Sequence, residues 1–266
     1  MRAHYLNSNA VKLGHKISIF SQDILNINEV KTLNSIKKIP ITNNYIEYRY
    51  INIFSLVVNY ITVSLGASKL FTGNILKIFK PKILNELIKK CDIIKVEHPW
   101  QFSYIFNKKP NDIPIILVEH NAEFDRLIGS NDLMLLKPLK KLLINTAIEK
   151  EKFAVENADL IFTVSEEDKN KLGRKYSVNK SKIYVIPNGV DTSRFTISTH
   201  TEKNIYKRQI MGDSNKKVIL FVGSLYHPNI EAVKFIIDKV APEVLKNYKN
   251  SLFVIVGSVG NYFKSI

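Results

Sequence analysis

The sequence predicts an α/β fold in which strands of a parallel sheet alternate with helices, as a doubly wound domain followed by the beginning of a second one. Three observations predict it. Short apolar runs in the first 190 residues are continuous rather than alternating, which is typical of strands buried on both faces of a sheet. Longer stretches with helical periodicity separate several of these runs. The same pattern restarts after a polar segment at 196–215.

The elements follow in order along the chain. A helix is expected to end at Gly14, a natural C′ glycine, and to lead into a strand at 16–20. The uncharged run 51–68 reads as a buried or interfacial helix, because its Asn, Ser and Thr residues and short length disfavour a membrane span. Further strands are expected at 92–97, 113–120, 159–165, 182–187, 216–224 and 252–258, with helices at 133–157, at 166–175 and from about Asn229.

These elements divide the chain into a first domain over 1–190, a linker over 191–215 and the start of a second domain over 216–266. Two strands and one crossover do not close a stable sheet, so the second domain is expected to be incomplete. The first domain is expected to lack its opening strand, because no Gly-rich turn precedes the first helix.

The formal charge is +15, from 39 Lys and Arg against 24 Asp and Glu, which indicates an anionic partner or a biased genome composition. Nucleic acid is the weakest candidate partner, because no nucleic-acid-binding motif is present. An anionic membrane surface and a phosphorylated small molecule both stay open. A single cysteine, Cys91, excludes an intramolecular disulfide and favours a reducing setting. The six His are scattered, so no metal site is expected, and the first residues lack the apolar core of a signal peptide.

Several motifs occur in a characteristic order: "VEHNAEFDRL", "ADLIFTVSEEDKNKL", "IYVIPNGVDTSRF", "VILFVGSLYHPNIEAVKFI" and "FVIVGS". Together they strongly resemble the retaining glycosyltransferases of the group 1 (GT4) family, which have the GT-B fold. The likeness runs from about residue 3 to residue 260. It implies transfer of a sugar from a UDP- or GDP-linked donor to a lipid-linked or saccharide acceptor, with the donor held mainly by the second domain and no further cofactor. It also implies a location in the cytoplasm or at the inner face of the cell membrane.

Two strand ends carry the candidate catalytic residues. His120 follows a central strand, at the edge where open α/β sheets bind ligands, and Asn121 beside it is either part of the site or a helix cap. Glu97 and His98 end another strand. The family resemblance places a His near this point in an "HxHEP"-like pattern, but Glu97 stands at that position here and His98 follows it.

The donor site implied by the resemblance lies in the second domain. Gly223 and Ser224 match the family's donor diphosphate loop, where many members have Gly-Arg. Asn229 matches a helix start whose N-terminus could face the pyrophosphate. Gly257 and Ser258 repeat the glycine position on the next strand. The alternative for Gly223 is close packing at a strand end.

The segment between the domains reads as a hinge. Pro187 is expected to stop strand pairing, and Asn188 and Gly189 to adopt the positive φ angles of a tight turn. Asp191 would fix the crossing by a local hydrogen bond and Phe195 by an apolar anchor. An ordinary β-turn at a strand end is the alternative.

Two basic amphipathic stretches suit an anionic membrane surface, and the alternative for each is a core-facing stripe with a solvated basic face. One contains Lys69, Lys77, Lys80, Lys82, Lys89 and Lys90. The other, 133–153, combines Leu135, Leu139, Leu142 and Leu143 with Lys137, Lys140 and Lys141.

One family feature is missing from the sequence: the donor-binding Glu-x7-Glu region has no counterpart before Ile266. The chain is therefore expected to be an interior piece of a glycosyltransferase, truncated at both ends. The alternative function is a non-catalytic fragment of a split or decayed enzyme, acting as an acceptor-side or membrane-binding module.

Overall fold

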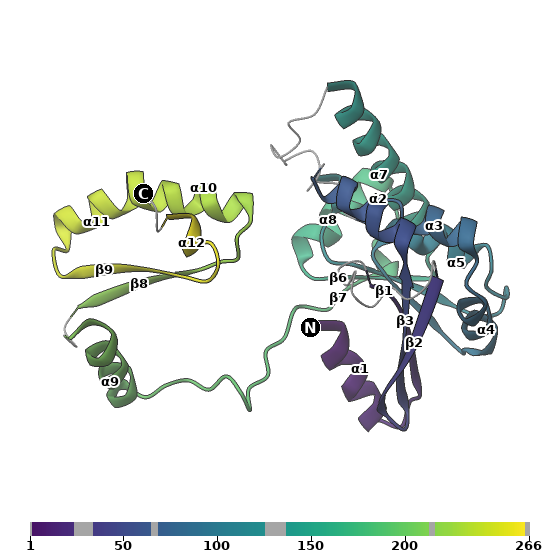
Figure 1. Ribbon diagram of the computed structural model, residues 1–266, viewed down its shortest axis with the longest axis horizontal. Helices are drawn as coiled ribbons and strands as arrows, with labels where there is room; N and C mark the ends of the chain where they lie inside the picture. Colours follow the sequence, from purple (N-terminus) through teal and green to yellow (C-terminus); the bar gives the residue numbers. More distant parts are fainter. Residues whose placement is uncertain (1, 24–33, 65–68, 126–136, 213–215, 264–266) are drawn as a thin grey trace. The chain divides into compact units, whose positions relative to one another are not determined.

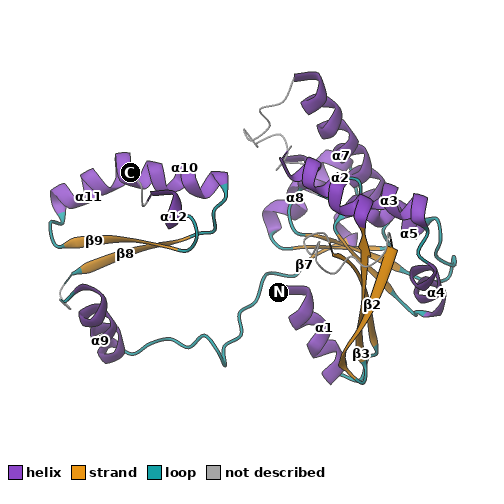
Figure 2. Cartoon of the chain, viewed as in Figure 1, coloured by secondary structure: helices purple, strands orange, loops and turns teal. Residues whose placement is uncertain are grey.

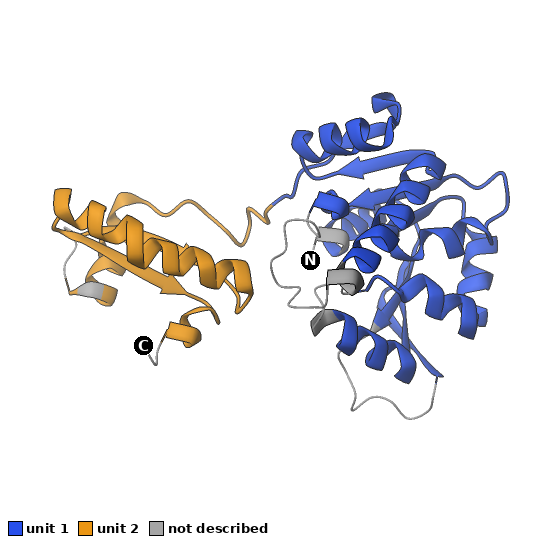
Figure 3. Ribbon diagram, turned by 90° about the horizontal axis from the view of Figure 1, so that it is seen from above, with its two compact units in different colours: residues 1–189 blue, residues 190–266 orange. Residues whose placement is uncertain are grey.

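The computed structural model describes residues 2–23, 34–64, 69–125, 137–212 and 216–263. The chain divides into two compact units, Met1–Gly189 and Val190–Ile266, coloured blue and orange in Figure 3. Each unit is an α/β structure that contains a parallel sheet, as the sequence predicts (Figure 2).

The first unit opens with a helix and a mixed sheet of three strands, in the order β1-β3-β2. Gly14 follows the helix with a φ of 94°, as its place as a C′ glycine requires. Strand β1 pairs with β3 in parallel, and β2 pairs with β3 antiparallel. The bounds are α1 (Arg2–Lys12), β1 (Ile17–Asp23), β2 (Asn34–Thr42) and β3 (Tyr45–Asn52).

The β2–β3 hairpin is an addition to the predicted elements. Strand β2 is largely exposed and carries Lys37, Lys38 and Pro40, a composition that suits the edge of a sheet. Continuous apolar runs mark strands that are buried on both faces, so an exposed edge strand of this kind does not carry that signal. Within the described residues, β1 pairs with β3 and not with the strands of the second sheet, so the first unit contains two sheets rather than one.

The second sheet holds four parallel strands in the order β4-β5-β6-β7 (Figure 1). Each lies inside an apolar run that predicted it. Their central side chains, among them Ile115, Leu117 and Ile161, are completely buried against Phe102 and the flanking helices. The strands are β4 (Ile94–Glu97), β5 (Ile115–Glu119), β6 (Leu160–Thr163) and β7 (Ile183–Val185).

Helices surround this sheet and supply the rest of the core. Helix α8 begins at Ser165, whose side chain accepts a hydrogen bond from the backbone N–H of Asp168. The helices are α2 (Ile53–Ser64), α3 (Thr72–Phe79), α4 (Lys82–Lys90), α5 (Phe102–Phe106), α7 (Lys137–Asn157) and α8 (Glu166–Tyr176), with 3₁₀ turns at Pro99–Gln101 and Lys180–Lys182. In the parts of the chain that are described, no helix combines the length and apolarity needed to cross a bilayer.

In the described part of the second unit, β8 and β9 form a parallel strand pair. A helix lies within the segment 191–215 that the sequence predicts to be a linker, and Thr199 and Glu202 form a capping box at its start. The bounds are α9 (His200–Met211), β8 (Lys217–Val222), α10 (His227–Phe235), a π-helical turn (Ile236–Val240), α11 (Ala241–Asn247), β9 (Ser251–Val256) and α12 (Gly260–Phe263).

Candidate functional site

The carboxyl ends of β4 and β5 bring the candidate catalytic residues to one edge of the sheet. The strands are parallel neighbours, with Glu97 paired to Val118. The backbone N–H of His98 donates to the carbonyl of Val118 at 3.0 Å, which extends the ladder by one bond. His98 and His120 therefore leave the sheet side by side, at the edge where α/β sheets bind ligands.

Two His–Glu pairs connect these strand ends, and each joins a residue at the end of β4 to a residue that follows β5. His120 Nε2 lies 2.8 Å from Glu97 Oε2, and His98 Nδ1 lies 3.3 Å from Glu123 Oε1, which is an ion-pair distance without hydrogen-bond geometry. The two imidazole rings lie 4.6 Å apart between their centroids. We refer to Glu97, His98, His120 and Glu123 as the His–Glu cluster.

The charge on Glu97 fixes the tautomer of His120. Burial raises the pKa of Glu97, but the hydrogen bond from His120 and the Lys95 ammonium 3.0 Å away outweigh burial and lower it to about 2. A carboxylate can only accept hydrogen bonds, so Nε2 of His120 carries a proton. In the neutral ring Nδ1 then holds the lone pair, which can accept a hydrogen bond or a proton from a bound hydroxyl group.

His98 has an unusual backbone conformation, with φ 68° and ψ 155°. This region is populated almost only by glycine, and a side chain there costs on the order of 1–3 kcal/mol. Such strain persists only where the surroundings impose it, and it is concentrated at functional sites. The conformation therefore supports a functional rather than a purely structural role for this strand end.

Buried acidic residues lie beneath the His–Glu cluster, and the sequence interpretation did not single them out. Glu151, on α7, accepts hydrogen bonds from the backbone N–H groups of Glu123 (2.6 Å) and Phe124 (3.1 Å) and from the Tyr176 hydroxyl (2.6 Å). These hydrogen bonds hold the segment that carries His120. Glu151 thus caps its backbone N–H groups, a role for which the sequence suggested Asn121. Asn121 itself is exposed.

Glu119, the last residue of β5, is completely buried. Neither of its carboxyl oxygens has a hydrogen-bond partner within the described structure. Burial raises its pKa well above the usual value, and the nearby carboxyl groups of Glu151, Glu123 and Asp168 raise it further. Burial likewise raises the pKa of Glu151, and the charge of Glu123 contributes, so that it reaches about 7 despite the hydrogen bonds that Glu151 accepts.

The donor-side candidates come together in the second unit, at the carboxyl ends of β8 and β9. The side-chain amide of Asn229 donates to the carbonyl of Ser224 at 2.9 Å, and the hydroxyl of Ser258 accepts the N–H of Leu225 at 2.7 Å. Gly257 has a φ of 101°, and a Cβ there would lie 2.2 Å from the carbonyl oxygen of Gly223. The two glycines therefore let two loops approach closely beside the start of α10.

The hinge candidates differ from prediction in one respect. Strand pairing ends at Ile186, just before Pro187, as expected. The expectation of positive φ angles at Asn188 and Gly189 is wrong, because neither residue has one. Residues 186–191 form no turn or bend after β7.

Beyond this point Asp191 makes the local contacts expected of it. Its Oδ1 accepts hydrogen bonds from the backbone N–H of Ser193 at 3.1 Å and from the Ser193 hydroxyl at 2.6 Å. The ring of Phe195 is 60% exposed and lies against the Arg194 guanidinium, so its role as an anchor stays a prediction.

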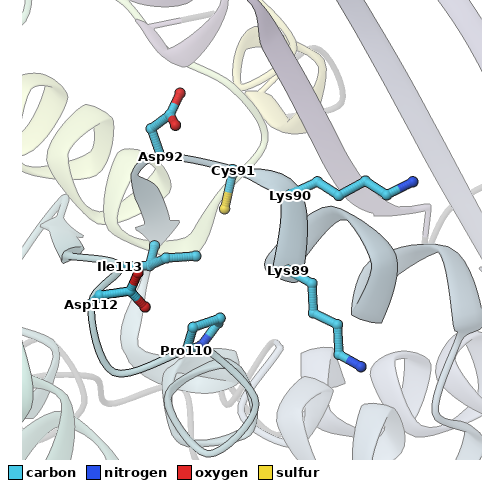
Figure 4. Close-up of a pocket in the computed structure, with 7 residues that line it drawn as sticks. All are labelled: Lys89, Lys90, Cys91, Asp92, Pro110, Asp112 and Ile113. Atoms are coloured by element: carbon cyan, nitrogen blue, oxygen red, sulfur yellow. The ribbon is translucent and has the colours of Figure 1, made fainter.

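A surface pocket lies at the opposite edge of the second sheet and contains none of the candidate catalytic or donor-site residues (Figure 4). Its lining includes Lys89, Cys91, Asp92 and Ile113, which precede β4 and β5 rather than follow them. Burial raises the pKa of the Cys91 thiol, so the thiol stays protonated and unreactive at neutral pH. Among the described residues, no group of His, Cys, Asp and Glu side chains is arranged to hold a metal ion.

Comparisons with known proteins give a family for this chain. The model of Glycosyltransferase Family 4 matches residues 2–194. No curated protein sequence gives a significant match.

Solved structures that resemble the chain include TarM, with 18% identity and a TM-score of 0.45 over 69% of this chain and 32% of TarM. They also include S. aureus MnaA with UDP (16%, TM-score 0.42, 95% of this chain and 66% of MnaA). A third is Anabaena Alr3699/HepE in complex with UDP (14%, TM-score 0.45, 90% and 69%). The chain thus spans about a third of the length of TarM and about two thirds of the other two. Because the family model covers most of the chain, and the fold is the α/β fold expected for it, this protein belongs to Glycosyltransferase Family 4, a family of GT-B glycosyltransferases.

Proposed function

We propose that the protein transfers a sugar from a UDP- or GDP-linked donor to a hydroxyl group of a lipid-linked or saccharide acceptor, with retention of configuration. The observation that carries this proposal is the His–Glu cluster at the carboxyl edge of the second sheet. It presents an imidazole oriented by a carboxylate, on a strained strand end, where such sheets bind ligands.

In this reaction the bond between the anomeric carbon and the diphosphate oxygen breaks, a bond to the acceptor oxygen forms, and the acceptor hydroxyl loses its proton. We assign His120 to the acceptor side, where its Nδ1 accepts a hydrogen bond from the hydroxyl and takes up the proton that the hydroxyl loses. Glu97 holds the ring, and His98 lies against it. Negative charge that develops on the leaving diphosphate would be stabilised by the backbone N–H of Ser224 and by the N-terminus of α10, which includes Asn229. The N–H of Gly223 donates to the Val256 carbonyl, so Gly223 would serve by leaving room for the diphosphate.

We further propose that the reaction takes place in the cytoplasm, at the inner face of the cell membrane, with the enzyme held there by basic helices. In the second predicted basic stretch, residues 133–136 lie outside the described residues, as do the side chains of 137–140. Of the rest, Lys141 and Leu142 are exposed and Leu143 is buried. The stretch around α3 and α4 is described, and its exposed Lys77, Lys80 and Lys82 support the proposal.

Isothermal titration of the folded chain with UDP, GDP and their sugar conjugates tests the donor half of the proposal. Micromolar binding that Gly223→Val weakens at least tenfold supports it, because a side chain at 223 would collide with Phe221 and Asn229. Gly189→Ala is the matched control, since nothing lies within 4 Å of a Cβ at that position. A folded chain that binds no nucleotide contradicts the donor assignment and favours the non-catalytic alternative.

The acceptor half is tested by measuring how fast the nucleotide is released when the chain is given a donor that it binds. A panel of lipid-linked and saccharide acceptors is added in turn. His120→Ala should abolish acceptor-dependent release while the donor affinity stays unchanged. Unchanged acceptor-dependent release in His120→Ala would remove His120 from the reaction.

A further inference from the structure

Helix α2 has its polar residues on the inside and most of its apolar residues on the outside, Leu56 being the buried exception among those described. Ser55, Asn59 and Thr62 are buried, whereas Val57 is 54% exposed and Tyr60 is 81% exposed. Ile53 and Phe54 are also exposed. Positions 53, 54, 57 and 60 share one side of a helix, so the exposed apolar groups form a continuous stripe. The sequence left open whether this run is buried or interfacial, and the structure shows a surface helix.

Hydrogen bonds fix this orientation. Asn52 Oδ1 accepts the N–H of Ser55 at 2.9 Å, and the Ser55 hydroxyl accepts a hydrogen bond from the Gln22 amide at 3.3 Å. Further along the helix, Asn59 Oδ1 accepts the N–H of Lys69 at 3.2 Å. Turning the apolar stripe inward would break these bonds and expose the groups that make them, so the apolar side faces outward for a structural reason.

Helix α3 packs beside α2 and extends the apolar surface (Figure 1). The rings of Phe54 and Phe79 stack with centroids 5.4 Å apart, which joins the two helices. Next to this contact Ile78 is 71% exposed. We call the exposed side chains of Ile53, Phe54, Val57, Tyr60 and Ile78 the α2–α3 face. Contiguous exposed apolar groups of this kind mark interaction sites rather than ordinary surface.

The charge around the face is positive. Between Arg49 and Glu86 the sequence contains no Asp or Glu, and its charged residues are Lys69, Lys77, Lys80 and Lys82. Lys77 also lies close enough to Lys150, on α7, for its charge to lower the pKa of Lys150 in addition to the larger effect of burial. Apolar residues beside lysines are the combination that binds an anionic lipid surface.

We propose that the α2–α3 face docks on a bilayer that contains anionic lipids. Its apolar side chains enter the headgroup region, and Lys77 on α3 and Lys80 directly after it lie against the negative surface. The inference deepens the membrane contact of the proposed function and rests on it. A second copy of the chain fits this face less well, because a symmetric dimer would bring two such lysine groups together in a protein of formal charge +15.

Sedimentation with vesicles tests the inference, using the whole chain and vesicles of phosphatidylcholine with or without phosphatidylglycerol. We expect binding only to the anionic vesicles, weakening as salt is added. Lys77→Gln with Lys80→Gln should weaken binding by about 25-fold, since each lysine near such a surface contributes about fivefold. Lys246→Gln with Lys249→Gln, exposed positions in the second unit, makes the same charge change and should have little effect.

The apolar part has its own variants. The double variant Val57→Ser and Tyr60→Ser should weaken vesicle binding about tenfold or more. Two large apolar side chains that leave water when the face docks are replaced by small polar ones, and the free energy of their burial is lost. Ile197→Ser is the control, since Ile197 is 95% exposed in the second unit. Equal binding to neutral and anionic vesicles, or no difference between the α2–α3 variants and their controls, would overturn the inference. Self-association that Val57→Ser with Tyr60→Ser abolishes, without any loss of vesicle binding, would assign the face to a second copy instead.

Nucleotide titration of the same proteins separates this inference from the proposed function. The α2–α3 variants should keep the UDP or GDP affinity of the wild type. Gly223→Val should lose nucleotide affinity and keep vesicle binding. A wild-type chain that binds vesicles but no nucleotide would contradict the donor assignment and leave the docking surface in place.

Discussion

Removing the carboxyl group of Glu151 should destabilise the first unit more than any change at the surface of the same helix. Glu151 is completely buried and accepts three hydrogen bonds, from the N–H groups of Glu123 and Phe124 and from the hydroxyl of Tyr176. Burial and the charge of Glu151 both raise the pKa of Tyr176, so its hydroxyl keeps its proton and needs an acceptor. In Glu151→Ala all three donors lose their acceptor at once.

The size of the effect follows from these three donors. A buried donor without a partner costs about 1–3 kcal/mol, so the three together cost roughly 3–9 kcal/mol. Relaxation and water entry reduce this sum, and so does relief of the repulsion between Glu151 and the carboxyl groups of Glu119 and Glu123. We therefore expect Glu151→Ala to lower the free energy of unfolding by about 3–4 kcal/mol.

Urea unfolding followed by tryptophan fluorescence measures this loss in the first unit alone. The single tryptophan, Trp100, lies in that unit and is only 3% exposed. With an m-value of about 2 kcal/mol per M, the midpoint should fall by about 1.5–2 M. Glu156→Ala is the matched control on the same helix, because Glu156 is exposed and, among the described residues, pairs only with Lys152, at 3.7 Å, so its loss should cost less than about 0.5 kcal/mol. Equal midpoints for the two variants would refute the reasoning.

Three further predictions concern pH and backbone conformation. Because the pKa of Glu97 is lowered to about 2 in the folded state, its ionised form stabilises the fold above pH 4.5. The stability deficit of Glu97→Gln, about 1–2 kcal/mol at pH 7, should thus shrink between pH 4.5 and 2 in urea melts, and a constant deficit would contradict this. Glu119 is the opposite case. Its raised pKa means that only the unfolded state ionises above about pH 4.3, so the folded protein loses stability as the pH rises. Glu119→Gln should stabilise increasingly as the pH rises above 4.5, and a pH-independent change would show that the carboxyl group is not held neutral. Finally, Gly257→Ala places a Cβ against the Gly223 carbonyl at a φ of 101° and should weaken nucleotide binding at least tenfold by titration, whereas Gly189→Ala should not. Equal affinities for these two variants would argue against a donor site at this loop.

The sequence alone determined the elements whose signals are local. Continuous apolar runs located β4 to β9. In β4 to β6 the reason is burial, because strands covered on both faces need apolar side chains at every position, whereas β8 has the same composition and is largely exposed. Ser165 precedes a helix because its side chain accepts a hydrogen bond from a backbone N–H of the first turn. Gly14 follows a helix because glycine adopts the positive φ angle of this position without strain. The carboxyl ends of β4 and β5 could be predicted as the candidate site, since parallel strands bring their ends to one edge. Family membership followed from motifs that are themselves short and local.

Only the tertiary structure decided which side chains meet and which face of an element is buried. The pairing of Glu97 with His120 depends on the register of two strands, and the role of Glu151 depends on a helix more than 25 residues away from the segment that it holds. No local signal distinguishes Glu151 from the exposed Glu156 on the same helix. Helix α2 shows the same limit, because its composition is compatible with either burial or exposure. Its apolar side faces outward because Ser55 bonds to Gln22 and Asn59 bonds to Lys69 on the inner side. Composition and periodicity describe a segment by itself, whereas burial, hydrogen bonding and pKa are set by what other segments place beside it.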